Sequence, residues 1–249
     1  MKDLLTCAMD IGEQMLVCGA EVHRVEDSIQ RMCLAMGASR IDIFIITSSM
    51  VATVQTPDGE TVTQTRRIKS TGTDIERLDL LNGLSRRICS EGLSLPEIRE
   101  AYRKIIETRN YPFWLECLSC AVIAGTFTLF FGGGVAEAII STLIGALIKL
   151  LGNIMSRTFT NRIFERFISS FAASVLAFIA LRLSLVGDVD KILIGNIMLL
   201  IPGIGLTNAL RDLFTGDSIA GLLRSIEACL MALAIAAGYF LCTVLMGGI

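Results

Sequence analysis

The hydrophobic pattern changes character about halfway along the chain. Up to residue 112, apolar residues recur at short helical or alternating spacings among many charged ones. From residue 113 onward they form long runs, and a run of about 20 apolar residues is enough to span a bilayer as a helix. The predicted spans are 113–131, 135–155, 167–186, 190–210 and 220–247. We therefore predict a first domain over 1–112 and an all-α transmembrane domain over 113–249.

Helical periodicity dominates the first domain. Residues 3–18 are predicted to form a helix that ends near Gly19, and residues 20–36 a second helix with an apolar stripe at spacings of three and four. Two more helices are expected after the capping boxes Thr73-x-x-Glu76 and Ser94-x-x-Glu97.

Strand signals lie between these helix pairs. Residues 41–47, 50–56 and 61–68 are rich in residues that favour strands, and Pro57-Asp58-Gly59 is a turn signal between the last two. The first domain is therefore predicted to be α+β, with a small antiparallel sheet.

The charges support this division and suggest an orientation. Residues 1–112 hold 14 of the 22 Lys and Arg and 16 of the 24 Asp and Glu. The connection 156–166 carries three arginines, whereas 131–136 has no basic residue, and basic connections stay in the cytoplasm. The N-terminus lacks the apolar core of a secretory signal. We expect a multi-pass protein of the inner (plasma) membrane, with a cytoplasmic N-terminal domain and the C-terminus outside.

Several kinds of function find no signal in the sequence. It contains no Walker loop, dinucleotide fingerprint or G-x-S-x-G motif, and its net charge of −2 gives no reason to expect nucleic-acid binding. Cys117 and Cys120 have redox spacing but lie in an apolar span, where small packing residues are the simpler interpretation. We expect a protein that is not an enzyme and has no cofactor.

The fourth span is interrupted by Pro202-Gly203-Ile204-Gly205, about 12 residues in. At about 1.5 Å per residue this is roughly 18 Å, near the middle of a ~30 Å hydrocarbon core. A helix that restarts after Gly205 would point its amide groups into the membrane, where they favour an anion such as a carboxylate. The predicted substrate-binding residues are Pro202, Gly203, Gly205, Thr207, Asn208 and Arg211. The alternative is a proline kink with glycine packing.

Acidic residues in or near the spans are candidates for proton coupling. Glu227 is the best of them, and Asp212 and Glu116 are the others. The alternative for Glu227 is a static pair with Arg224 at the inner interface, and Asp217 is suited to cap the fifth span.

One face of the second predicted helix is strongly polar. His23, Glu26 and Asp27 could hold a metal in a membrane-tethered enzyme, but Arg24–Asp27 and Asp27–Arg31 pairs would make the same face an ordinary solvated one. A ligand or subunit contact is a third possibility. The predicted gating or subunit-contact residues are His23, Arg24, Glu26, Asp27, Asp217 and Arg224.

Two stretches resemble the threonine/serine exporter (ThrE-type) family. They are GEQMLVCGAEVHRVED over 12–27 and the pattern Pro202-Gly203-x-x-x-Thr207-Asn208-Ala209-x-Arg211-Asp212, followed by Gly216-Asp217 and Gly221-x-x-Arg224. The resemblance implies secondary export driven by the proton gradient. Longer members carry a second membrane half, so a chain with five spans is similar to the split, YjjP-like form. That form is associated with succinate export, and the fused form with threonine and serine export.

We therefore expect the large subunit of an oligomeric exporter for a small carboxylate-bearing metabolite, succinate-like or threonine/serine. The resemblance implies a small integral-membrane partner, the YjjB-like subunit. The bilayer is the other expected partner, and nucleic acid is not. The rival interpretations are the membrane-tethered metal-dependent enzyme and a non-transporting regulatory subunit.

Overall fold

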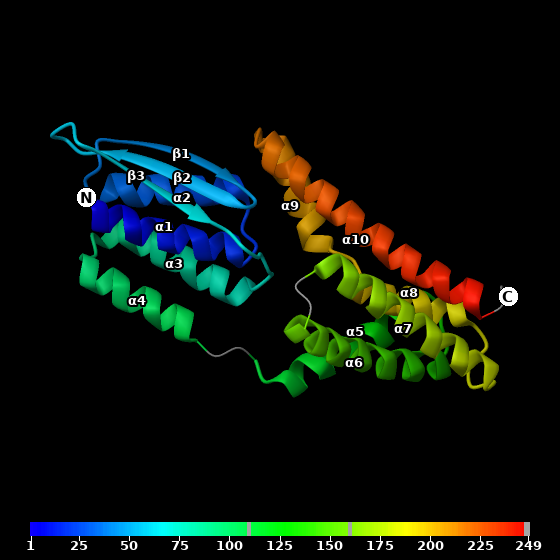
Figure 1. The fold of residues 1–249 in the computed structure, drawn as a ribbon. Helices are drawn as coiled ribbons and strands as arrows, with labels where there is room; N and C mark the ends of the chain where they lie inside the picture. Colours follow the sequence, from blue (N-terminus) through cyan, green and yellow to red (C-terminus); the bar gives the residue numbers. More distant parts are fainter. Residues whose placement is uncertain (109–110, 159–160, 247–249) are drawn as a thin grey trace. The chain divides into compact units, whose positions relative to one another are not determined.

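The computed structural model describes all residues except 109–110, 159–160 and 247–249 (Figure 1). The predicted end of the last span, residue 247, is among those not described. The elements follow in the order α1 (Lys2–Val17), α2 (Val22–Ala35), β1 (Arg40–Ile46), β2 (Ser49–Gln55), β3 (Thr61–Arg67), α3 (Ile75–Glu91), α4 (Leu95–Glu107), α5 (Phe113–Phe130), α6 (Val135–Thr158), α7 (Arg162–Arg182), α8 (Val189–Leu200), α9 (Gly203–Thr215) and α10 (Ser218–Leu245).

The chain divides into two compact units. The N-terminal unit combines Met1–Arg109 with Gly203–Ile226, and the bundle unit combines Asn110–Pro202 with Glu227–Ile249. Helix α9 and the first residues of α10 therefore belong with the N-terminal unit, although the hydropathy pattern groups them with the spans.

The N-terminal unit contains the predicted antiparallel sheet, in the order β1-β2-β3. Phe44 pairs with Val51, and Val54 pairs with Val62. Strand β2 alternates buried and half-buried residues, since one face of the sheet packs on α1 and α2 while the other does not. Large side chains fill the core beneath it, including Leu5, Met9, Met15, Ile29, Met32 and Met50.

One of the two predicted capping boxes is confirmed. The Ser94 side chain accepts a hydrogen bond from the Glu97 amide, and the Glu97 carboxylate accepts one from the Ser94 amide. The Thr73–Glu76 box is wrong, because Asp74 caps α3 by accepting a hydrogen bond from the Arg77 amide at 2.9 Å. An aspartate one residue further along competes for the same orphan amide groups.

The bundle unit is built from membrane-length helices. Among the described residues, α5, α6, α7 and α10 are each long and apolar enough to cross a membrane, and α8 with α9 makes a fifth span if the bent pair is counted as one. The chain is therefore a multi-pass membrane protein. Helix α7 begins at Arg162, earlier than the predicted 167, because Asn161 caps it through two backbone amides.

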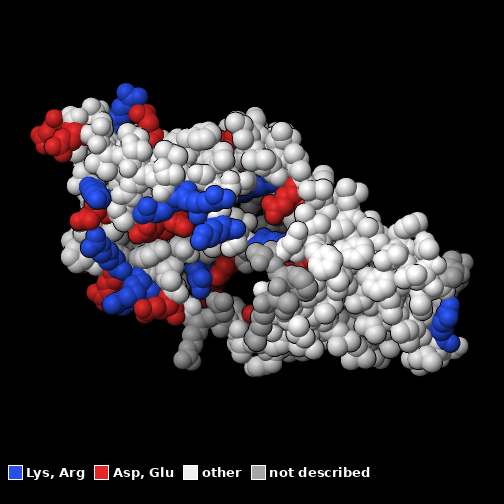
Figure 2. Space-filling model, viewed as in Figure 1, with Lys and Arg blue, Asp and Glu red and all other residues white. Residues whose placement is uncertain are grey.

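The surfaces of the two units differ in charge. On the face shown in Figure 2, Lys, Arg, Asp and Glu gather over the elements of the N-terminal unit, whereas the membrane-length helices show few charges. Many large apolar side chains of these helices are exposed, among them Leu143, Ile154, Leu233 and Phe240. Exposed apolar helices of this length are what a bilayer solvates.

Candidate functional site

The break in the fourth apolar run lies where the sequence places it. Helix α8 ends at Leu200 and α9 begins at Gly203, and Ile201 between them has an extended backbone. Pro202 cannot donate the amide hydrogen bond that a continuous helix needs. The restart falls at Gly203 rather than after Gly205, so Gly205 lies inside the first turn of α9.

The first turn of α9 is open. Gly203 is exposed, and a Cβ atom built on it would meet no other atom within 4 Å. The hydroxyl hydrogen of Thr207 is not available to a ligand, because Thr207 Oγ1 donates to the Gly203 carbonyl at 3.0 Å. The first-turn amide groups are therefore the available donors here.

The next polar residues of α9 contact the turn between α1 and α2. Asn208 Nδ2 donates to the Gly19 carbonyl at 2.8 Å, and Arg211 forms an ion pair with Glu21. Two of the six predicted substrate-binding residues, Asn208 and Arg211, are thus engaged in contacts within the N-terminal unit.

Asp212 is the most deeply buried charge of this group. It is 0% exposed, and its Oδ1 accepts a hydrogen bond from the Val22 amide at 3.1 Å. Val22 is the first residue of α2, so its amide has no partner within that helix. A carboxylate at a helix N-terminus is also favoured by the helix dipole. Asp212 therefore caps α2 from 190 residues away.

Arg224 completes the arrangement from α10. Its Nη1 lies 3.2 Å from Asp212 Oδ2, and its Nη2 donates to the Ala20 carbonyl at 2.8 Å. The side chain is only 13% exposed. The contact with Asp212 replaces the predicted Arg224–Glu227 pair. We call the contacts of Asn208, Arg211, Asp212 and Arg224 with residues 19–22 the α2 clamp.

Two glycines let the α2 clamp form. Gly19, with φ +95°, ends α1 in a Schellman motif. The Gly19 amide donates to the Leu16 carbonyl, and the Ala20 amide donates to the Met15 carbonyl. A Cβ at Gly221 would come within 2.8 Å of the Leu213 backbone nitrogen, so only glycine lets α10 approach α9 this closely. These residues belong to the two stretches that carry the family resemblance, and the structure brings those stretches together.

The other predicted proton carriers lie elsewhere. Glu116 pairs with Lys149 at 2.7 Å in the bundle unit. Glu227 is exposed on α10. Asp217 occupies the position of a helix cap, since its carbonyl accepts from the Gly221 amide at 2.9 Å, but its buried Oδ2 has no hydrogen-bond partner.

The polar face of α2 is mostly engaged in structural contacts. Glu26 accepts from the Ile45 amide of β1 at 2.9 Å, and Asp27 pairs with Arg31 at 2.8 Å. His23 and Arg24 are exposed. Burial raises the pKa of the Glu26 carboxyl, the nearby Asp217 charge adds to this, and the Ile45 hydrogen bond and His23 oppose it. Across the part of the chain that the structure describes, no three His, Cys, Asp or Glu side chains form a metal-binding group.

Sequence reasoning missed a neutral polar cluster inside the bundle. Asn196 on α8 donates to Ser141 on α6 at 2.9 Å, and Thr128 on α5 contacts the same hydroxyl at 2.7 Å. Asn196 is 1% exposed, and its Oδ1 has no hydrogen-bond partner. The available signal was one polar residue on each of three apolar runs, but nothing local indicates that the three meet.

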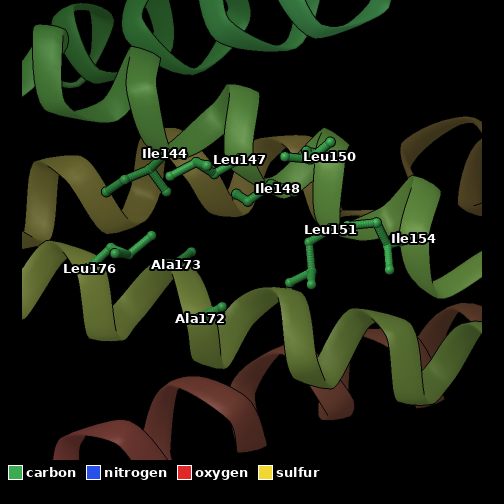
Figure 3. Close-up of a pocket in the computed structure, with 9 residues that line it drawn as sticks. All are labelled: Ile144, Leu147, Ile148, Leu150, Leu151, Ile154, Ala172, Ala173 and Leu176. Atoms are coloured by element: carbon green, nitrogen blue, oxygen red, sulfur yellow. The ribbon is translucent and has the colours of Figure 1, made fainter. Parts of the chain in front are cut away.

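A pocket of about 220 Å³ between α6 and α7 does not suit a carboxylate (Figure 3). Its lining side chains are all aliphatic. Such a surface suits lipid tails or apolar side chains, since it offers an anion no hydrogen-bond donor. The α2 clamp and the open turn of α9 remain the better candidates.

Three relatives show what this chain is similar to. It is 25% identical over 241 residues to a Mycobacterium tuberculosis protein named "Probable threonine/serine exporter", covering 95% of this chain and 45% of that one. It is 24% identical to the Escherichia coli "Probable succinate transporter subunit YjjP", covering 95% and 92%. It is 24% identical to the Corynebacterium glutamicum "Threonine/serine exporter", covering 94% of this chain and 50% of that protein. The chain thus spans about half of the two exporters and nearly all of the subunit.

The named activities of these relatives are transport, which contradicts the alternative of a membrane-tethered enzyme. No solved structure matches the chain. The family model described as "Putative threonine/serine exporter" matches residues 6–246, nearly the whole length. The chain therefore belongs to the threonine/serine exporter family.

Proposed function

We propose that this chain is the large subunit of a secondary exporter that moves a small carboxylate-bearing metabolite out of the cytoplasm. The observation that carries the proposal is the break at Ile201 and Pro202, after which α9 begins at Gly203 with first-turn amide groups that have no acceptor within the helix. Helix amide groups bind carboxylates well when no other acceptor occupies them. Succinate, threonine and serine, the substrates named for the relatives, all offer a carboxylate.

In this proposal the substrate carboxylate binds the amide groups of Gly203 and Gly205. Arg211 assists by leaving its ion pair with Glu21 and pairing with the substrate carboxylate instead. Thr207 and Asn208 would contribute only after leaving their present acceptors, Gly203 and Gly19. The α2 clamp would then act as the gate, because α9 cannot move relative to α2 while Asp212 caps that helix. The other gating candidates, His23, Arg24, Glu26, Asp27 and Asp217, lie on or near the same end of α2.

We also propose that the proton gradient drives export, with Glu227, Asp212 or Glu116 carrying the proton. Glu227 is the first choice, because Asp212 and Glu116 already face the cations Arg224 and Lys149. A nearby cation favours the charged form of a carboxylate, so protonating a paired carboxylate costs free energy.

The proposed setting is the inner membrane, with the N-terminal unit in the cytoplasm and the C-terminus outside. A small YjjB-like membrane subunit completes the path. The relative named as a transporter subunit supports a partner. Arg157 near the end of α6, with Arg162 and Arg166 at the start of α7, supports the orientation.

Efflux from proteoliposomes tests the proposal. Vesicles containing this chain and its partner subunit are loaded with labelled succinate, threonine or serine, and a pH gradient is imposed. We expect gradient-dependent efflux of at least one substrate, and vesicles with either subunit alone serve as controls. No efflux of any of the three would overturn the proposal. In the same assay Glu227→Gln should lose its dependence on pH, and a full pH dependence would exclude Glu227 as the proton carrier.

A further inference from the structure

A polar groove lies between α2 and α3 of the N-terminal unit, and none of its lining residues belongs to the α2 clamp. Its volume is about 410 Å³. Helix α2 contributes Arg24, Asp27, Ser28 and Arg31, and α3 contributes Asn82, Ser85, Arg86, Cys89 and Ser90. The spacings of three and four place each set along one side of its helix. Two packed helices therefore face each other here with polar stripes.

The charge of the groove is unbalanced. Three guanidinium groups line it, against the single carboxylate of Asp27, which pairs with Arg31 at 2.8 Å. Within the described residues, neither Arg24 nor Arg86 takes part in any of the ion pairs found. Two positive charges are thus left for a ligand.

The groove also has a polar interior. Asn82 and Ser85 are each only 6% exposed, although a position this deep between two helices is usually apolar. Asn82 Nδ2 donates to the Leu78 carbonyl, and Ser85 Oγ donates to the Asn82 carbonyl. The second Nδ2 hydrogen of Asn82 remains available as a donor for an anion, whereas the hydroxyl hydrogen of Ser85 is already used. A merely solvated helix face would need charges at its rim but not buried polar groups beneath them.

We propose that this groove binds a small dianion, a metabolite with two carboxylates or a phosphate group. Arg24 and Arg31 are seven residues apart on one helix, about 10 Å along its axis, and Arg86 faces them from α3. Guanidinium groups bind carboxylate and phosphate oxygens through paired, charge-assisted hydrogen bonds. The site would let the N-terminal unit respond to the concentration of an anionic metabolite. It does not depend on the transport proposal.

Cys89 provides the readout, because it is exposed and lines the groove. The full chain, in nanodiscs of neutral phosphatidylcholine, is alkylated with N-ethylmaleimide, and peptide mass spectrometry follows each cysteine. Inorganic phosphate and succinate are the two probes, with sodium chloride at matched ionic strength as the control. A bound dianion should slow alkylation of Cys89 by 1 + [L]/Kd, about elevenfold at ten times Kd. Free glutathione, alkylated in the same mixture, should react at an unchanged rate.

Substitutions assign the effect to the groove. Arg24→Ala and Arg86→Ala should each raise the Kd obtained from the protection of Cys89 about tenfold, as expected for losing one charge-assisted contact. Arg87→Ala is the matched control, since Arg87 is the next residue on α3 and pairs with Glu91 outside the groove.

Four results would overturn the proposal. They are protection by sodium chloride alone, protection by neither probe, protection that survives both arginine substitutions, and protection only when phosphatidylglycerol replaces the neutral lipid. The last would assign the groove to lipid headgroups rather than to a free metabolite. A failure of export in proteoliposomes would leave the binding result standing.

Discussion

The N-terminal unit and the bundle unit are held together by different kinds of contact. Large side chains such as Met9, Met15 and Ile29 fill the first core, whereas glycine, alanine and serine line the contacts between α5, α6 and α8. Burying large apolar groups stabilises a unit in water. In lipid that driving force is absent, so helices associate where small residues let their backbones approach. The contrast therefore follows from the solvent of each unit.

The two units also use polar groups differently. The N-terminal unit buries a charged pair, Asp212 and Arg224, whose atoms also bond backbone groups of the α1–α2 turn. The cluster where α5, α6 and α8 meet in the bundle is neutral and consists of Thr128, Ser141 and Asn196. A neutral hydroxyl or amide is far less costly to place in an apolar environment than a charge.

The largest expected effect comes from breaking the buried charge. Asp212→Ala leaves Arg224 and the Val22 amide without their partner, and removing one member of a buried pair costs about 3 kcal/mol or more. We expect the N-terminal unit to lose stability by this amount. Hydrogen exchange of peptides covering residues 18–26 should show faster exchange at the start of α2.

Asp27→Ala is the control, because it removes one carboxylate from an exposed ion pair with Arg31. Exposed pairs contribute less than about 1 kcal/mol, so this variant should unfold close to the wild type. Equal losses of stability in the two variants would show that Asp212 does not act as a buried cap.

A smaller effect is expected from crowding the bundle. A Cβ at Gly195 would lie 2.1 Å from Thr128 Oγ1 and 2.9 Å from the Ala124 carbonyl oxygen. Gly195→Ala must therefore push α8 away from α5, at a cost of about 2 kcal/mol. Thermal unfolding in detergent measures the loss. Gly203→Ala, at an open position, should be nearly neutral, and a similar loss there would remove close packing as the explanation.

A third variant removes one neutral polar contact. Ser141→Ala deletes a hydroxyl that donates to the Ala124 carbonyl and contacts both Thr128 and Asn196. Hydrogen bonds within membrane bundles contribute about 1 kcal/mol or less, so we expect a loss of that size. The matched control is Ser156→Ala, whose hydroxyl bonds only its own helix at the Asn153 carbonyl. A loss at Ser141 as large as that of Asp212→Ala would erase the contrast between the two units.

The smallest effect concerns pH and Glu26. Its pKa is raised by burial, so the folded protein holds the proton more tightly than the unfolded chain. Stability therefore falls as the pH rises from the ordinary glutamate value through the raised one. Glu26→Gln lacks this loss. In denaturant unfolding at a series of pH values, the free energy of unfolding of the variant should increase relative to that of the wild type as the pH rises towards neutral. A constant difference at every pH would contradict the argument.

Much of the fold could be predicted from local patterns. Strands β1, β2 and β3 begin and end within about one residue of their predicted ranges, because alternation and turn residues are local signals. The break at Pro202 is likewise fixed by a residue that cannot continue a helix. The exact start of α3 could not be predicted as well, since Thr73 and Asp74 are both good caps and only the folded backbone selects between them.

The partners of the polar residues could not be predicted. The sequence neighbours of Asp212 and Arg224 place both residues close to the ends of predicted spans. Their assignment to the N-terminal unit depends on residues about 200 positions away. Asn196 gave even less signal, because one amide in an apolar run is compatible with many packings.

The sequence by itself determined which segments are helices, strands and membrane spans, and where the fourth span breaks. Only the tertiary structure decided that α9 belongs with the α1–α2 turn, and that Asp212 caps the start of α2. The physical reason is the range of the interactions. Hydropathy and backbone propensity act within a few residues, whereas a buried charge must find its partner wherever the fold brings one close enough to replace water.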